Sequence, residues 1–444
     1  MNKLKIISIL ILLSLIFALI GAFLVWQQNW FNVDDNKTET LSFWKLIPEL
    51  TGFNGERTYL LLFQNNLELR PSGGYIGSFG ILKINNAKIV SFEIHDTNIF
   101  DGFGKEQTEP PEPIKNYLKI DNWQMRDGNW SPDFSISAEQ VEYFYHLQGG
   151  HEEFNGIVGV NATVLPELLK LTGPIYLEEI DKTFKSEDVL YELEYEVEKG
   201  YLERGIDFGE RKTVLKILVK ETLKELLEKT FLEQKELKNI VFEEFDKKNI
   251  VLFLKNRENQ KIISKLGWSG EVDKFYENDY LMIVEANLAS KKSNAFIKRE
   301  VEYYVDLTKN ELEGTLKIRY IHEGKEKDWF NDDYRAYLRI YLPYESWILE
   351  AKGQKNETSF SKELGKTVFN CWIEIPSGQE KVIEIKYLLP ERIKHEKEYK
   401  ILIQKQIGVE SIPFNITLKG MNQKTYIKNK IIEKDWEGII SFEK

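Results

Sequence analysis

The stretch "TYLLLFQNNLELRPSGGYIGSFGILKIN", residues 58–85, decides the fold of this chain. Its apolar runs at 58–64 and 78–85 are typical of β-strands, and "KIVSFEIHD" (88–96) predicts a third strand after the Asn85-Asn86 turn. The four glycines at 73, 74, 77 and 80 lead into a strand, and Ser72 stands where a dinucleotide fingerprint needs its first glycine. Since no GxxxxGK[ST] motif occurs either, no nucleotide cofactor is expected.

The chain beyond this stretch predicts a mixed α/β domain. Helical patterns at 137–150 and 163–173 alternate with short apolar runs at 154–162 and 174–180, which implies a sheet with helices packed against it. Two long helices are expected at 186–201 and 210–231. One apolar stripe of the second helix predicts core packing; it comprises Val214, Leu215, Leu218, Thr222, Leu226 and Leu227.

The pattern of apolar and polar residues changes near residue 296. Seven short segments of alternating apolar and polar residues follow, without helices between them. This pattern predicts an antiparallel β-sandwich of immunoglobulin or fibronectin type.

Composition excludes several classes of protein. The 444 residues carry a net charge of −11, which argues against a nucleic-acid partner. Cys371 is the single cysteine, so neither an intramolecular disulfide nor a cysteine-based metal site is possible. The five histidines are scattered, with no HExxH motif and no tight spacing to carboxylates, which argues against a zinc enzyme.

The N-terminus predicts a membrane-spanning helix. Residues 6–28 are uncharged and mostly apolar, long enough to cross a bilayer, with Lys3 and Lys5 before them. A cleaved signal peptide is the alternative, but the apolar run is long and no small-residue cleavage site follows. We therefore expect a single-pass protein with a cytoplasmic N-terminus and an extracytoplasmic bulk. The expected divisions are 1–30 (tip and anchor), 31–56 (stalk), 57–295 (mixed α/β domain) and 296–444 (β-sandwich).

Polar residues at the mouth of the first strand are candidates for anion binding. Glu68 and Arg70 alternate with leucines, so both point to one side of the extended chain. Arg70 could clamp a phosphate or carboxylate, and the backbone of Gly73 and Gly74 could cradle it. The alternative is an ion pair between Glu68 and Arg70 beside a tight hairpin.

Further charged residues lie at the end of the third predicted strand and in a predicted loop. Asp96 and Asp101 end the third strand, and Arg126 lies in a loop between two tryptophans. Carboxylates near arginines would suit Mg²⁺ together with an oxyanion, with Glu68, Asp96 and Asp101 as metal ligands. They would equally suit a loop held by ion pairs and Asx turns.

Four segments resemble the bacterial domain of unknown function 4012 family, in order, over residues 57 to about 305. They are "YLLLFQNNLELRPSGGYIGSFGILKINNAKI", "WQMRDGNWSPDFSISAEQ", "FNGIVGVNATVLPELLKLTGPI" and "YLMIVEANLASKKSNAFIKREVEYYV". The resemblance implies a membrane-anchored envelope protein without an established activity.

A more distant resemblance is to the LytR-CpsA-Psr family, which transfers glycopolymers from polyprenyl diphosphate to the cell wall. "NLELR", "IHDT" and "ERKTVLKILVKETL" are similar to its motifs and place Arg211 beside the candidates above. The family's second arginine-and-aspartate motif is replaced here by "PSGGYIGS", and His95 stands where the family has an arginine. The resemblance implies a shared fold, and these departures remove part of the diphosphate clamp.

Two functions follow from these observations. The first is a non-catalytic protein that binds an anionic ligand, such as an envelope glycopolymer or polyprenyl phosphate, or an envelope protein. The second is a glycopolymer phosphotransferase or pyrophosphatase similar to the LytR-CpsA-Psr enzymes. Fold alone does not decide between them.

Overall fold

The computed structural model describes residues 46–104, 106–288, 291–356, 358–395 and 397–442. Among these residues, no helix is long and apolar enough to cross a membrane. That finding contradicts the predicted localisation as a single-pass protein. The predicted membrane segment, residues 6–28, lies outside the described residues.

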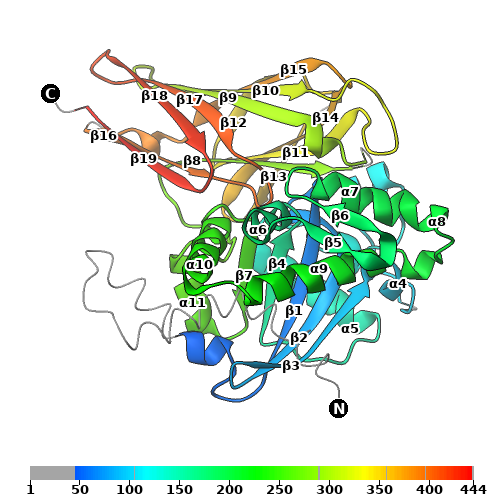
Figure 1. Cartoon of the computed structure of the whole chain (residues 1–444). Helices are drawn as coiled ribbons and strands as arrows, with labels where there is room; N and C mark the ends of the chain where they lie inside the picture. The colour runs from blue at the N-terminus through cyan, green and yellow to red at the C-terminus, as the bar shows by residue number, and fades with distance from the viewer. Residues whose placement is uncertain (1–45, 105, 289–290, 357, 396, 443–444) are drawn as a thin grey trace.

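A five-stranded mixed sheet forms the centre of the α/β part (Figure 1). Its strand order is β3-β2-β1-β4-β7, and only the β1–β4 pair is parallel. The bounds are β1 (Arg57–Arg70), β2 (Gly73–Asn85), β3 (Lys88–Asp96), β4 (Gly156–Asn161) and β7 (Ile250–Leu254). The three strands predicted from the opening stretch are therefore confirmed.

Helices cover both faces of this sheet, because successive residues of β1 point to opposite sides. Leu60 and Leu62 pack with α5 (Phe134–Leu147), whereas Tyr59 and Leu61 pack in a second core. The helices of that second core are α6 (Val164–Thr172), α9 (Thr213–Leu227), α10 (Phe231–Asp246) and α11 (Arg257–Lys265). The helix expected at 210–231 ends at Leu227 in the structure, before α10 begins.

Smaller elements surround one end of α9. They are α4 (Thr97–Phe100), β5 (Ile175–Leu177), β6 (Lys182–Phe184), α7 (Val189–Tyr195) and α8 (Tyr201–Glu203). A π-helical turn, Glu196–Gly200, continues α7, and we call residues 189–200 the α7 segment. Leu46, Ile47 and Leu50, within the range predicted as a stalk, are buried in the same core as α9 and α10.

Two six-stranded sheets form a β-sandwich above the α/β part (Figure 1). The first has the order β12 (Trp347–Lys352), β15 (Glu380–Leu389), β10 (Leu312–His322), β9 (Ile297–Asp306), β17 (Ile412–Lys419) and β18 (Thr425–Ile432). The second has the order β13 (Ser359–Glu363), β14 (Lys366–Ile375), β11 (Tyr334–Pro343), β8 (Asp279–Asn287), β16 (Glu398–Gln404) and β19 (Trp436–Ser441). Side chains from both sheets share one hydrophobic core.

The sandwich differs from the predicted one in two respects. β8 lies before residue 296, within the range expected for the α/β domain, yet it is a central strand of the second sheet. The sandwich is also not wholly antiparallel, since β8 pairs with β16 and β9 pairs with β17 in parallel. All seven segments expected after residue 296 form strands.

Candidate functional site

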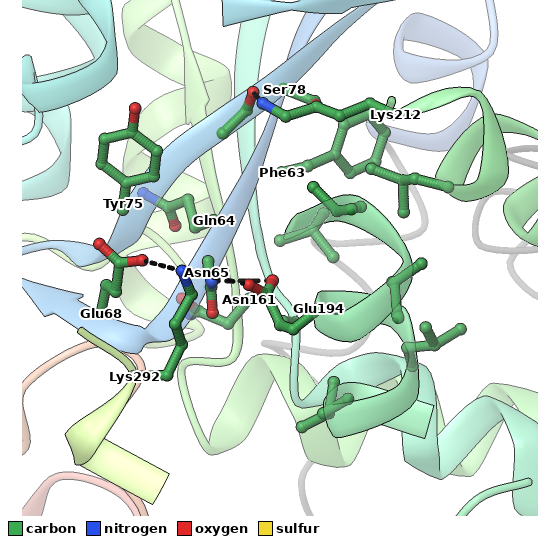
Figure 2. Close-up of a pocket in the computed structure, with 18 of the residues that line it drawn as sticks. Phe63, Gln64, Asn65, Glu68, Tyr75, Ser78, Asn161, Glu194, Lys212 and Lys292 are labelled. Atoms are coloured by element: carbon green, nitrogen blue, oxygen red, sulfur yellow. Dashed lines mark hydrogen bonds and ion pairs between the residues drawn. The ribbon is translucent and has the colours of Figure 1, made fainter. Parts of the chain in front are cut away.

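A cavity of about 570 Å³ opens between the central sheet and the helices α6, α7 and α9 (Figure 2). Its size lies within the range of small-molecule sites. Its floor comes from β1 and the end of β4, including Phe63 and Val160, and from Ala162 directly after β4. Most of its wall is apolar, and that part comprises Val164, Leu165, Leu168, Leu190, Leu193, Val197, Leu215, Val219 and Leu223.

The apolar stripe of α9 thus serves two purposes. Leu218 and Leu226 are fully buried in protein cores, as the sequence predicts. Leu215 lines the cavity instead, and so does Thr222, whose buried hydroxyl has no hydrogen-bond partner in the described part of the chain.

Charged side chains gather at the polar end of the cavity. Five cations line it together with four carboxylates, and the set comprises Arg70, Arg126, Arg211, Lys212, Lys292, Glu68, Asp127, Glu194 and Glu198. Most of these groups already neutralise one another, so the partners of each decide what the site can bind.

Arg70 is held by protein groups. Its Nε donates to Asp127 Oδ1 at 2.9 Å and its Nη1 donates to the carbonyl oxygen of Asn287 at 2.6 Å. Both charged side chains are 5% exposed. Arg70 therefore lines the cavity while its guanidinium serves as a structural junction, and it does not pair with Glu68.

Gly73 and Gly74 do not reach the cavity. They pair with Arg70 and Leu69 in the β1–β2 ladder. A Cβ at Gly74 would lie 2.0 Å from the carbonyl carbon of Asn65, so the close approach of two strands explains this glycine. Gly73 has a φ of +125°, which a residue with a side chain rarely adopts.

Glu68 belongs to a cluster around Lys292. The Nζ of Lys292 lies 3.0 Å from Glu68 and 3.5 Å from Glu194 (Figure 2). It also lies 3.5 Å from Glu198. Burial lowers the pKa of Lys292, but the three carboxylates more than offset this and hold it above its usual value. Burial raises the pKa of Glu194 to about 7. The cluster connects the α7 segment to β1 and to the loop after β8.

Asp96 lies behind the polar end and pairs with Lys212. Its Oδ1 accepts from Lys212 Nζ at 2.9 Å and from the backbone amide of Asn98 at 2.8 Å. Lys212 also donates to the carbonyl of Gly77. Burial lowers the pKa of Lys212, with Asp96 opposing that shift.

Asp101 organises the loop that carries Arg126. Its two oxygens accept from the backbone amides of Met125 and Arg126 at 3.0 and 3.2 Å. Burial raises its pKa to about 6. The carboxylates of Glu68, Asp96 and Asp101 each have their own partners and do not form a joint metal-ligand group in the described residues. Mg²⁺ at these three residues stays a prediction.

Arg211 is the least saturated cation of the site. It precedes α9, is 10% exposed, and lies 3.6 Å from Glu198 and 4.0 Å from Asp96. Its Nε is buried without a hydrogen-bond partner among the described residues. Its guanidinium lies over the ring of Phe208 at 4.3 Å, which fixes its orientation.

Arg126 is the second accessible cation. It is 28% exposed, donates to Gln124 Oε1 at 2.5 Å and lies 3.8 Å from Asp101. Sequence reasoning selected Arg126 and Arg211, and both line the cavity. It missed Lys212, Lys292 and Glu194; the adjacency of Lys212 to Arg211 was the one available signal.

Residues 54–197 match the family model "protein of unknown function (DUF4012)". The match covers β1 to the α7 segment, and so includes most of the cavity floor and part of its wall. No curated protein matches the chain. The resemblance to the LytR-CpsA-Psr family is not shown by these comparisons.

Solved structures give only weak similarities. Protein gbs0355 from Streptococcus agalactiae is 13% identical, with a TM-score of 0.31, over 51% of this chain and 75% of that one. Lin1025 protein from Listeria innocua is 12% identical, with a TM-score of 0.26, over 48% and 79%. A putative nutrient binding protein from Legionella pneumophila is 5% identical, with a TM-score of 0.25, over 36% and 70%.

Proposed function

We propose that the cavity binds an amphiphile that has a hydrocarbon chain and an anionic head group, such as a polyprenyl phosphate or its glycopolymer-bearing form. One observation carries this proposal: an apolar cavity ends at Arg211, a partly exposed arginine whose buried Nε has no hydrogen-bond partner in the described chain.

The apolar walls favour a hydrocarbon chain. Leucine and valine side chains from α6, the α7 segment and α9 face the same space, and that space offers few hydrogen-bond partners. Transfer of a methylene group from water to such a site contributes about 0.8 kcal/mol. A chain of several carbons would therefore bind without any specific polar contact.

The polar end favours an anion. Lys212 and Lys292 already have carboxylate partners within 3.0 Å, whereas Arg211 makes only longer contacts with carboxylates. A phosphate oxygen at Arg211 would receive the charge-assisted hydrogen bonds that the protein leaves unmade. Arg126, from the loop before α5, would contribute a second cation to the same phosphate group.

Binding without catalysis is the function that the geometry favours. A phosphotransferase or pyrophosphatase that uses Glu68, Asp96 and Asp101 would need them free to hold a metal. Each instead accepts a hydrogen bond or ion pair from the protein.

The test is a binding titration with farnesyl phosphate as the probe. Farnesol supplies the chain without the anion, and inorganic phosphate supplies the anion without the chain. We expect farnesyl phosphate to bind most tightly, and Arg211→Ala to raise its Kd at least about tenfold by removing a charge-assisted contact. Arg319→Ala is the matched control, because Arg319 lies on the sandwich, 44% exposed, and pairs with Glu300 and Glu380.

A bulky substitution tests the apolar part separately. Val219→Trp would fill the cavity from α9 and is expected to abolish binding of both farnesyl phosphate and farnesol. Absence of binding by the wild-type protein would overturn the proposal. An equal loss in Arg211→Ala and Arg319→Ala would overturn the assignment of the head group.

A further inference from the structure

The C-terminal end of α5 carries a group of metal-binding side chains that no part of the proposed function uses. Glu142 and His146 lie one turn apart on α5, and Glu153 joins them from the following loop. One ligand atom from each lies within 4.8 Å of the other two. Because α5 covers the face of the central sheet opposite α6 and α9, this group lies on the other side of the sheet from the cavity.

The orientation of the histidine ring suits metal binding. Nδ1 of His146 lies 3.0 Å from the carbonyl oxygen of Gly150, and a carbonyl can only accept a hydrogen bond. Nδ1 therefore donates to this carbonyl, and Nε2, which lies 3.7 Å from Glu142 Oε1, is the ring nitrogen placed to bind a metal ion. A ligating histidine commonly donates its other N–H to a backbone carbonyl in this way.

The loop that supplies this carbonyl is itself fixed. The amide of Gly150 donates to the carbonyl of Tyr145 at 2.9 Å, and Gly149 has a φ of +92°. The chain thus turns back beside α5 and returns Glu153 to the side of Glu142. Two ligands about 2 Å from a tetrahedral ion lie somewhat over 3 Å apart, so ligand atoms that are now within 4.8 Å must approach by up to about 1.5 Å.

The carboxylate of Glu142 is already paired with a positive charge. It is only 7% exposed, and its Oε1 accepts from the Nζ of Lys255 at 2.5 Å. Lys255 is 39% exposed and can turn outward into solvent. A divalent ion would replace this ammonium group and would also engage His146 and Glu153.

We propose that Glu142, His146 and Glu153 form a binding site for a divalent transition-metal ion, with Zn²⁺ as the preferred ion. An imidazole with two carboxylates suits Zn²⁺, whereas Mg²⁺ and Ca²⁺ prefer oxygen ligands alone. Three protein ligands leave a fourth position for water. Sequence reasoning did not consider the spacing of Glu142 and His146, which places these two residues one helical turn apart.

Calorimetric titration of the full chain with ZnCl₂ tests the site, with thermal unfolding as a second readout. We expect one Zn²⁺ per chain and a rise in Tm on binding. His146→Ala should weaken binding at least about tenfold. His151→Ala is the matched control, since this exposed histidine lies in the same loop and outside the group.

Lys255→Ala gives the sharpest result, because it should strengthen Zn²⁺ binding by removing the competing ammonium group. A gain of affinity cannot arise from loss of folding. Failure of the wild-type chain to bind Zn²⁺, equal losses in His146→Ala and His151→Ala, or tighter binding of Mg²⁺ than of Zn²⁺ would each overturn the proposal.

Discussion

The guanidinium of Arg70 is enclosed by partners from both halves of the molecule. Asp127 comes from the loop before α5, and the carbonyl of Asn287 comes from the end of β8 in the sandwich. The residue that looks most like an anion clamp in the sequence is therefore the one most fully used by the fold.

Removal of Arg70 should destabilise the protein strongly. Arg70→Ala leaves Asp127 buried without its counter-charge, and breaking a buried pair in this way costs about 3–5 kcal/mol. The free energy of unfolding in urea measures this cost, with Arg319→Ala as the exposed control. A loss below about 1 kcal/mol, the range of an exposed ion pair, would contradict the structural role of Arg70.

Asp279 predicts a pH dependence of stability. It is fully buried in the sandwich, where Tyr303 donates to it at 2.6 Å and Tyr399 donates to the same oxygen. Burial raises its pKa from 3.8 to about 6. The folded state therefore binds the proton more tightly than the unfolded state does. The resulting stability is fully present below pH 3.8 and is lost as the pH rises through about 6.

The Asp279→Asn protein isolates this contribution. Between pH 4 and pH 7 the wild type should lose about 2 kcal/mol more unfolding free energy than Asp279→Asn does, at about 1.4 kcal/mol per unit of pKa and with part of the contribution already lost at pH 4. Urea titrations of both proteins at the two pH values measure the difference. Parallel changes in the two proteins would rule out Asp279 as the source.

For single residues, the sequence indicated which side chains line the cavity better than it indicated which side chains pair with one another. Arg126 was selected from its chemistry and Arg211 from the resemblance to the LytR-CpsA-Psr family, and both line the cavity. The pairing of Arg70 with Asp127, and of Glu68 with Lys292, joins residues far apart in the chain. No local pattern encodes such pairs, because they depend on how the elements are packed.

Among the elements, the α7 segment has the most direct control over the cavity. It contributes Leu190, Leu193 and Val197 to the wall, and its Glu194 and Glu198 lie against Lys292. Lys292 belongs to the loop after β8, so the sandwich side of the molecule holds this wall in place.

Lys292→Ala should loosen the α7 segment. Three carboxylates would then lie together without their common cation. If this lowers the free energy that holds the α7 segment closed by about 1–2 kcal/mol, the equilibrium constant for its local opening rises about 5- to 30-fold. Hydrogen exchange of residues 189–200 should accelerate by that factor, and dissociation of farnesyl phosphate should become faster. Lys170→Ala is the control, because Lys170 makes an exposed pair with Glu167 on α6. Unchanged exchange would show that apolar packing alone holds the segment.

The elements also show why the cavity was not predicted. The apolar period of α9 is the same whether a side chain meets protein or an open cavity. Leu218 meets protein and Leu215 lines the cavity, although both belong to one stripe. Strand predictions were more successful, since two-residue alternation reports directly on burial in a sheet.

At the scale of the whole molecule, the α/β part and the sandwich are joined at the end of β1. The side-chain amide of Gln406 donates to the carbonyls of both Arg70 and Glu285. Asn66 donates to the carbonyl of Gly408, and Ser72 forms a bridge with Ile407. We expect a single cooperative unfolding transition for the two parts.

The segment 296–444 should not fold in isolation. It lacks β8, which lies between β11 and β16 in the second sheet and contributes Leu281 and Ile283 to the sandwich core. Circular dichroism during urea unfolding should show no cooperative transition for this segment. A sigmoidal transition would mean that β11 and β16 can pair without it.

The parallel ladders of the sandwich also determine when this protein can fold during synthesis. β8 must wait for β16, and β9 must wait for β17, and in each case more than about a hundred residues separate the paired strands. Closure of such long loops is slow, so a nascent chain emerging from the ribosome would expose the edges of β8 and β9 until β16 and β17 had been made. The protein would accordingly depend on chaperones during synthesis. A chain truncated after residue 400 would aggregate and would not form a shortened fold.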